Sequence, residues 1–372
     1  MKVLLCLASA AGGIGTHVAD LARSMHAAGH TVQVATDAAT RARFDLPGQA
    51  PLTVAAVREL ARGADVVHAH GFRAGLVSAV ATGAVATTAQ TTTTGTAPTT
   101  AQPRRGGEPG GRVPLVVSLH NPVRGAGLSP RRLVGGLAAR AVMRRADLVT
   151  GASSDLVADA LALGARRAEL AEVPSPRVPA LLATDRAAWR AEHRAALLAA
   201  HDVSGAPFVL TIARVAPQKG IDVLAAAADG APGTWGLVGP GQETLTTGGA
   251  LHLLGEAADV TPWLLAADVL VVPSEWEARA LVVQEAMAAG TPVVARRVGG
   301  LPDLLDGVGL LVDGPQTEAA GPLARAVEAV LDHPERAARA ADAARERARG
   351  WDGLESSATR WVLRYRALAH VT

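Results

Sequence analysis

The chain has only one cysteine, Cys6, which excludes an internal disulfide. A single thiol in 372 residues is typical of a reducing compartment, so we expect a cytoplasmic protein. Cys6 lies inside an apolar run, and this position predicts a small buried side chain without chemistry of its own.

Aromatic residues and long apolar runs are scarce too. Aromatic residues make up 3% of the chain, which is too few for a base-stacking platform and argues against a nucleic-acid partner. No apolar run approaches the ~20 residues of a membrane span. Residues 1–12 have two interpretations, a short signal peptide or a first strand. The glycines that follow at once favour the strand.

Lysine is nearly missing, and so are several nucleotide and hydrolase motifs. Of 36 basic residues, only Lys2 and Lys219 are lysines, so a lysine in a loop is informative. The sequence lacks the phosphate loop G-x-x-x-x-G-K-[ST], the nucleophile turn G-x-S-x-G and any Asp-x-Asp pair. Without the Asp-x-Asp pair, the usual short motif for a nucleotide-bound metal is missing. We therefore expect no metal and no other cofactor.

The net charge of +2 hides an asymmetry between the two halves of the chain. Residues 1–183 carry 19 Lys and Arg against 11 Asp and Glu, a balance of +8. Residues 184–372 carry the remaining 17 against 23, a balance of −6. Opposite signs favour two domains with different partners, and the basic half favours an anionic one.

Apolar runs alternate with helical patterns along the whole chain. Near-continuous Val and Leu runs are typical of strands buried on both faces, and their alternation with helices indicates βαβ units. The predicted strands are residues 2–8, 31–36, 52–57, 65–70, 114–120 and 148–152, then 208–213, 234–238, 251–254, 269–273, 292–295 and 309–312. Two such series predict two doubly wound α/β domains.

The expected domains are residues 1–183 and 184–349, because prolines 174, 176 and 179 interrupt regular structure between the two series. Residues 87–111, rich in Thr, Gly, Pro and Gln, are predicted to be a disordered insertion. Residues 350–372 are predicted to form a helix that packs its aromatic side chains back toward the first domain.

Glu277 and Glu285 form the strongest candidate site. Glu277 lies in a loop after an apolar run, and Glu285 lies in the helix-forming segment that ends at Gly290. In an open parallel sheet, this strand–loop–helix order places both at the ligand crevice. Carboxylates accept several hydrogen bonds, which suits a hydroxyl-rich ligand. The alternative is an ordinary amphipathic helix with its acids in water.

Cations and glycines follow other predicted strands. Arg214 ends a strand and Lys219 precedes a helix, so a guanidinium, an ammonium and free backbone N–H groups would converge on an anion. The alternative is that Lys219 is a chance surface lysine. Gly13 and Gly15 predict close backbone approach to a ligand, with a plain tight turn as the alternative.

Three histidines lie at or near strand ends. His68 and His70 share one face of their strand because side chains alternate. Such a pair can bind a metal, but no third ligand of matching spacing accompanies it, and a packed core histidine is favoured. His120 ends its strand beside Asn121, and we expect it to face a ligand.

Taken in order, these motifs resemble the retaining glycosyltransferases of family 4, the group 1 glycosyl transferases, which have the GT-B fold. The match comprises the glycine-rich first loop, Gly29-His30-Thr31-Val32, His120, Arg214-x4-Lys219-Gly220, Glu277-x7-Glu285 and residues 285–294 and 298–302. The resemblance implies two Rossmann-like domains facing a central cleft. It places the acceptor mainly on the first domain and a nucleotide-sugar on the second.

The resemblance also implies residue roles. Arg214 and Lys219 would bind the donor diphosphate and stabilise the leaving group, Glu277 and His120 would contact the sugar, and Glu285 would bind the ribose. The residues implied to be catalytic are Arg214, Lys219, Glu277 and His120. Those implied to bind the donor are Gly13, Gly15, Arg214, Lys219, Glu277, Leu281, Val282, Glu285, Gly299 and Gly300.

The predicted function is a hexosyltransferase-type glycosyltransferase that moves a sugar from a nucleoside-diphosphate sugar to a glycan, lipid or small molecule. Fixed cations at the departing diphosphate stabilise the transition state more than the ground state, and retention by front-face attack needs no protein nucleophile. The alternatives are a GT-B-fold sugar-nucleotide epimerase and a non-catalytic nucleotide-sugar-binding protein. Ala278-Arg279-Ala280 departs from the family's usual glycine and aromatic, and we expect it to bear on donor choice.

Residues 129–145 carry five arginines and are predicted to form a basic amphipathic helix with Leu133, Val134 and Leu137 facing inward. One interpretation is a solvated arginine face. The other is reversible docking on anionic lipid at the inner face of a membrane, which the basic first half favours.

Overall fold

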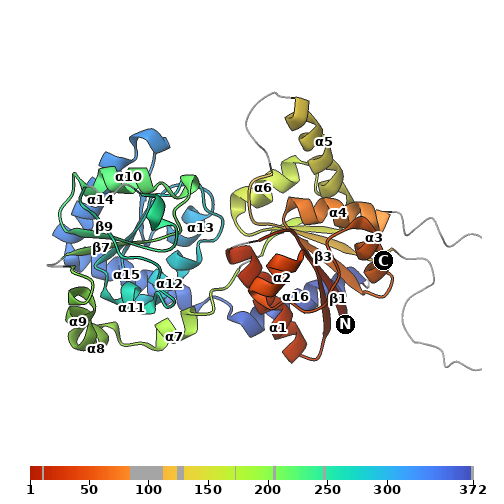
Figure 1. The fold of residues 1–372 in the computed structure, drawn as a ribbon, viewed down its shortest axis with the longest axis horizontal. Coiled ribbons are helices and arrows are strands. Elements are labelled where there is room, and N and C mark those ends of the chain that lie inside the picture. The colour runs from red at the N-terminus through yellow and green to blue at the C-terminus, as the bar shows by residue number, and fades with distance from the viewer. Residues whose placement is uncertain are drawn as a thin grey trace, which may run out of the picture. The chain divides into compact units, whose positions relative to one another are not determined.

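The computed structural model describes residues 1–10, 12–83, 112–123, 130–171, 173–203, 207–245 and 249–369. The chain divides into two compact units (Figure 1). Unit 1 is Met1–Ala171 together with Leu354–Thr372, and unit 2 is Glu172–Gly353. The first junction thus lies at residues 171 and 172, where the sequence placed it at 183 and 184. The predicted insertion at 87–111 lies outside the described residues.

Unit 1 is built on one parallel sheet with the strand order β2-β1-β3-β4-β5-β6. Its strands are β1 Lys2–Leu7, β2 Thr31–Ala35, β3 Val66–His70, β4 Leu115–Leu119, β5 Leu148–Gly151 and β6 Ala168–Leu170. Its helices are α1 Gly13–Ala27, α2 Ala38–Phe44, α3 Val54–Ala61, α4 Phe72–Gly83, α5 Pro130–Arg145, α6 Ser154–Ala162 and α16 Leu354–Ala369.

Helices cover both faces of this sheet, so its central strands are buried throughout. α1 and α16 pack together, and Trp361 and Tyr365 of α16 join the apolar core under α1. α3, α4 and α5 pack in succession on one another. Cys6 is fully buried in β1, as predicted, and burial raises the pKa of its thiol to about 12.

One predicted strand is wrong. Residues 52–57 belong to a loop and to the start of helix α3 rather than to the sheet. The hydroxyl of Thr53 accepts a hydrogen bond from the N–H of Ala56, which caps the helix. Val57 and Ala61, four residues apart, are its buried positions, so the apolar spacing there is helical.

Unit 2 also has one parallel sheet, with the order β12-β11-β10-β7-β8-β9. Its strands are β7 Phe208–Ile212, β8 Thr234–Val238, β9 Leu251–Leu253, β10 Val269–Val272, β11 Val293–Arg296 and β12 Leu310–Val312. Its α-helices are α7 Val178–Ala183, α8 Arg186–Trp189, α9 Ala195–Ala199, α10 Ile221–Ala228, α11 Thr261–Ala266, α12 Leu281–Ala289, α13 Leu301–Leu305, α14 Ala320–Asp332 and α15 Pro334–Arg349. Shorter elements are the π-helix η2 Arg190–Arg194 and the 3-10 helices η3 Pro217–Lys219, η4 Gln242–Thr244 and η5 Gln316–Glu318.

The two apolar cores of unit 2 lie on opposite faces of its sheet. α10 and α14 cover one face, and α7, α11, α12 and α15 cover the other. The predicted architecture of two doubly wound parallel sheets is therefore confirmed. Because all strands of the sheet are parallel, the loops that follow β7, β10 and β11 leave it at the same edge.

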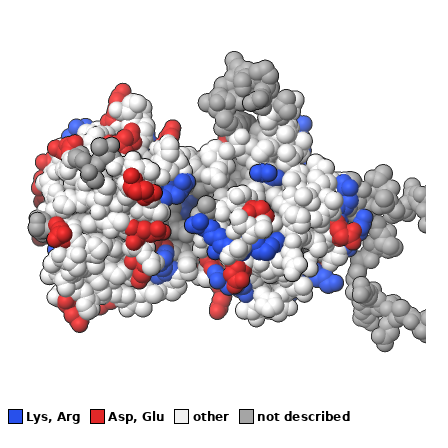
Figure 2. Space-filling view, viewed as in Figure 1, with Lys and Arg blue, Asp and Glu red and all other residues white. Residues whose placement is uncertain are grey.

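The surface repeats the charge asymmetry of the sequence. On the face drawn in Figure 2, acidic side chains are spread over unit 2, whereas basic side chains are more frequent on unit 1. Within the described ranges, no helix is both long enough and apolar enough to cross a bilayer.

Candidate functional site

The loop after β7 carries the two predicted cations. Arg214 is exposed and pairs with no carboxylate of the described residues. Lys219 ends the short helix η3 and is followed by Gly220, whose φ of +63° lies in the left-handed region. A Cβ at Gly220 would lie 2.4 Å from the carbonyl oxygen of Pro273, so glycine lets this loop pack directly against the loop after β10.

Lys219 and Glu277 meet although 58 residues separate them. Lys219 Nζ lies 2.5 Å from Glu277 Oε1, and the hydroxyl of Ser274 donates to the same oxygen at 2.7 Å. The N–H of Glu275 donates to the carbonyl of Gln218 at 2.9 Å. The loops after β7 and β10 are therefore joined through side chains and main chain.

Arg296 was not predicted as a site residue, yet it contacts the main chain of the loop after β10. It is buried at the end of β11, and its guanidinium donates to the carbonyls of Ser274 at 3.2 Å and Gly314 at 2.9 Å. It also bonds the side-chain oxygen of Gln316. The main chain that carries Glu277 is thus held by a buried cation.

The loop after β11 touches Glu277 through its two glycines. Gly300 N–H donates to the main-chain carbonyl of Glu277 at 2.8 Å. Gly299 has a φ of +54°, and a Cβ there would lie 2.0 Å from that carbonyl oxygen. This approach requires glycine at 299 and fixes the backbone of Glu277.

Glu285 lies inside α12 and is 2% exposed. Its Oε1 accepts hydrogen bonds from Ser175 Oγ at 2.6 Å and from Arg177 Nη1 at 3.2 Å. Burial raises the pKa of Glu285, while the hydrogen bond from Ser175 and the charge of Arg177 act in the opposite direction. Ser175 and Arg177 were not predicted as site residues.

The two glutamates share one feature. In both, the protein donors engage Oε1, and Oε2 has no hydrogen-bond partner among the described residues. Leu281 and Val282, both half-buried, are the first two residues of α12, where backbone N–H groups have no intrahelical acceptor. This edge of unit 2 thus offers two carboxylate oxygens, helix N–H groups and the cations of Arg214 and Lys219.

In unit 1, His120 lies directly after β4 and is part of a buried group of histidines. His70 Nδ1 lies 3.2 Å from His120 Nε2, and the ring of His17 lies 5.7 Å from that of His120. His68 bonds Tyr365 Oη at 2.6 Å and Ser118 Oγ at 2.7 Å, as expected of a hydrogen-bonded core histidine. Across the described part of the chain, no group of three or more His, Cys, Asp or Glu is arranged to hold a metal.

The predicted glycines of the first loop lie at the start of α1. Gly13 is exposed and is the first residue of this helix. Gly15 is buried, and a Cβ there would lie 2.3 Å from the ring of Phe44. Gly15 therefore lets α1 pack closely on α2, a structural need that the sequence alone did not indicate.

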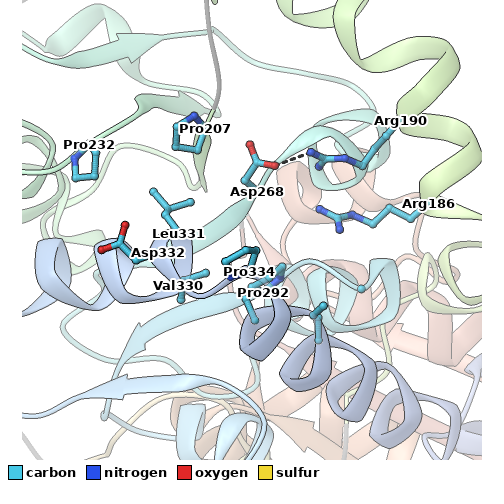
Figure 3. A pocket seen from close by; sticks show the side chains of 14 residues that line it. Arg186, Arg190, Pro207, Pro232, Asp268, Pro292, Val330, Leu331, Asp332 and Pro334 are labelled. Atoms are coloured by element: carbon cyan, nitrogen blue, oxygen red, sulfur yellow. Dashed lines mark hydrogen bonds and ion pairs between the residues drawn. The ribbon is translucent and has the colours of Figure 1, made fainter.

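A cavity of about 610 Å³ in unit 2 is separate from this site (Figure 3). Pro207, Pro232, Asp268 and Pro292 line it, and each lies one or two residues before a strand, so the cavity lies at the amino-terminal edge of the sheet. The candidate site lies at the carboxyl-terminal edge. Arg190 in the cavity wall donates to Asp268 at 2.5 Å and to the carbonyls that end α11, which is a structural role.

Family comparisons match both units. Residues 206–333 match the family described as "Glycosyl transferases group 1", and residues 12–176 match the "Glycosyl transferase 4-like domain". The chain belongs to the group 1 glycosyltransferases. Its two Rossmann-like units give it the GT-B fold of that family.

Individual relatives agree with this assignment. The chain is 50% identical over 99 residues to D-inositol 3-phosphate glycosyltransferase of Streptomyces griseus, which covers 26% of this chain and 20% of that protein. It is 35% identical over 196 residues to the Mycolicibacterium smegmatis protein of that name, covering 45% of this chain and 44% of the relative. The chain thus spans less than half the length of these relatives. Anabaena HepE, solved with UDP-glucose, superposes with a TM-score of 0.73 at 21% identity, covering 99% of this chain and 100% of HepE.

Proposed function

We propose that the protein is a glycosyltransferase that moves a sugar from a nucleoside-diphosphate sugar to a hydroxyl acceptor, with retention and without a metal. One observation carries the proposal. At one edge of unit 2, two cations lie in the loop after β7, and two anchored glutamates each leave one carboxylate oxygen unengaged. Cations suit a diphosphate, and carboxylate oxygens suit the hydroxyls of ribose and sugar.

In the proposed mechanism, Arg214 and Lys219 stabilise the negative charge that develops on the departing diphosphate. Glu277 positions the transferred sugar, because Lys219, Ser274 and Gly300 fix both its side chain and its main chain. Glu285 binds the ribose hydroxyls. A departing phosphate oxygen takes the acceptor proton on the same face, so the two glutamates act as anchors and not as a glycosidase pair.

The donor screen starts from the relatives. HepE was solved with UDP-glucose, and several relatives are named D-inositol 3-phosphate glycosyltransferase. We therefore propose UDP-sugars as the first donors to test, with GDP- and ADP-sugars beside them, and inositol 3-phosphate as the first acceptor. The assay contains EDTA, so that turnover also tests metal independence.

Lys219→Ala is the decisive variant. Loss of one fixed cation at a developing charge is expected to lower kcat by about 10²–10³-fold. Lys2→Ala is the matched control, because Lys2 is the only other lysine and is exposed at the start of β1. We would compare the wild type, Lys219→Ala and Lys2→Ala. For each protein, the thermal shift with donor is measured, the products are analysed, and the anomer is assigned by NMR. Lys219→Ala turnover equal to that of Lys2→Ala would refute the diphosphate assignment, and an isomerised sugar nucleotide would identify an epimerase.

We also propose that unit 1 makes peripheral contact with an anionic membrane surface in the cytoplasm. Of the residues predicted to face inward on α5, Leu137 is 65% exposed, and the side chains of Leu133 and Val134 lie outside the described residues; Ala139, Val142 and Met143 are buried instead. The solvent side of α5 therefore carries an apolar residue beside exposed arginines, a combination that binds anionic headgroups. Vesicles of anionic lipid should sediment the protein at low salt, and Leu137→Asp should reduce this. If neutral vesicles sediment as much protein as anionic vesicles do, the proposal is contradicted.

A further inference from the structure

The histidine group of unit 1 consists of His17 on α1, His68 and His70 on β3, and His120 after β4. The rings of His17 and His70 lie 5.6 Å apart, and those of His70 and His120 stack at 5.5 Å. All four side chains are buried. Burial lowers the pKa of His17 to about 4 and that of His120 to about 3, and it holds the pKa values of the other two well below their ordinary value.

At neutral pH each of these rings is therefore uncharged, with one nitrogen that donates and one that accepts. For His68, both nitrogens have hydroxyl partners, Tyr365 and Ser118, and hydroxyl groups can satisfy either tautomer. His70 differs, because its Nδ1 faces His120 Nε2 at 3.2 Å. Two nitrogens can share a hydrogen bond only if one of them carries the proton.

The other nitrogen of His70 decides between the two arrangements. His70 Nε2 is enclosed and has no hydrogen-bond partner in the described structure. If His120 donated to His70, Nε2 of His70 would carry a buried N–H without an acceptor. If His70 donates, Nε2 is left with only an unused lone pair. Orphaned buried N–H groups are rarer in proteins than under-used acceptors, so donation from His70 is favoured.

We propose that His70 is a positioning residue that donates its Nδ1–H to His120 Nε2 and thereby fixes His120 as the Nδ1–H tautomer. His120 then presents a hydrogen-bond donor, not an acceptor, to its ligand. In the context of the proposed function, on which this second step rests, that donor serves a hydroxyl oxygen of the transferred sugar. A ring held by its inner nitrogen also keeps its outer nitrogen in one direction.

The first test reads the tautomer directly. The full-length protein is labelled with 15N-histidine, and two-bond 15N–1H correlation spectra are recorded at pH 7.5, with His120→Gln used to assign the His120 signals. We expect the Nδ1–H tautomer for His120. The Nε2–H tautomer in the wild-type protein would overturn the proposal. This measurement needs neither donor nor acceptor, so it stands whether or not the proposed function is right.

Two variants of His70 separate the hydrogen bond from packing. Asn places an amide N–H near the position of Nδ1, whereas Phe keeps the ring and removes the donor. His70→Asn should keep the Nδ1–H tautomer of His120, and His70→Phe should lose it. A His70→Phe protein that keeps this tautomer would overturn the proposal. If His70→Phe fails to fold, the wild-type and His70→Asn spectra decide the question.

Kinetics with the nucleotide-sugar then test the consequence for the site. Loss of one oriented hydrogen bond should lower kcat about tenfold in His70→Phe, with little change in KM, and His70→Asn should recover most of it. Equal kcat in His70→Phe and wild type would show that the tautomer does not serve catalysis. Wild-type protein without turnover of any nucleotide-sugar would refute the proposed function while leaving the spectroscopic result intact.

Discussion

Acidification from pH 7.5 to pH 5 should destabilise unit 1 through its buried histidines. The pKa is lowered by burial to about 4 for His17 and to about 3 for His120, whereas an unfolded histidine has a value near 6.5. Below pH 6.5 the unfolded chain therefore binds protons that the folded unit does not. Stability from these groups is complete above that pH and is lost as the pH falls toward the folded pKa values.

The magnitude follows from the pKa difference. A pH of 5 is about 1.5 units below the pKa of an unfolded histidine, and each unit corresponds to about 1.4 kcal/mol in the free energy of unfolding. His17 thus lowers the free energy of unfolding by about 2 kcal/mol, because its folded form is still neutral at this pH. His120 doubles the loss to about 4 kcal/mol, a large part of the roughly 5–15 kcal/mol typical of a domain. His68 and His70 act in the same direction.

The assay compares two variants on the same helix. His17→Gln removes a buried titrating ring, and His26→Gln, an exposed position of α1, is the matched control. Each protein is equilibrated in urea at pH 7.5 or pH 5, pulse-labelled with deuterium at one common pH, and analysed by mass spectrometry of peptides from β1 and β3. This procedure gives the free energy of unfolding of unit 1 at both pH values.

We expect His17→Gln to lose about 2 kcal/mol less than wild type between the two pH values, and His26→Gln to match wild type. Comparing differences removes any constant effect of the substitution on packing. If His17→Gln loses as much stability as wild type, the acid sensitivity does not come from this buried ring and the reasoning fails.

Two further predictions concern unit 2. Glu285→Gln should weaken nucleotide-sugar binding in calorimetry without lowering Tm at pH 7.5, because burial raises the pKa of Glu285 and the ionised form therefore destabilises the fold above that pKa. Reduced Tm with unchanged affinity would contradict this. Gly299→Ala should lower the free energy of unfolding by about 1–3 kcal/mol and weaken donor binding, because the new Cβ would displace the carbonyl of Glu277. Gly307→Ala is the control, because Gly307 has a φ of +80° but no atom near its Cβ. It should lower the free energy of unfolding by about 1 kcal/mol and leave donor binding unchanged. Equal donor affinity in the two variants would contradict the role of Gly299 in packing against Glu277.

The sheets could be predicted because their signals are local. Buried parallel strands are typically near-continuous apolar runs, as in β10, and β3 and β4 are equally buried along their whole length although they include His68, His70 and Ser118. Residues 52–57 were wrongly predicted as a strand, because a short apolar run does not by itself distinguish strand from helix. The cap at Thr53 was the available local signal.

Partners that lie far apart in the sequence left no such signal. Ser175 and Arg177 contact Glu285 across 110 and 108 residues, and nothing in their own neighbourhood points to that carboxylate. The His-x-His pair on β3 was visible, but the contact of His70 depends on where β4 places His120, 50 residues later. Such contacts depend on the order of the strands in the sheet, which cannot be derived from a single sequence.

The segment Ala278-Arg279-Ala280, where the sequence departs from its family, has a structural explanation in part. The described non-glycine residues with positive φ are Asp45 and Asp202, so Ala278 adopts an ordinary backbone and replaces the family's usual glycine without strain. Arg279 is 8% exposed, and its guanidinium lies 5.3 Å from the centre of the Trp351 ring. A cation stacked on an aromatic ring and largely removed from water is held firmly. Arg279 therefore anchors the loop between Glu277 and Glu285 to the end of unit 2, so an effect of this segment on donor choice would act through the loop's position.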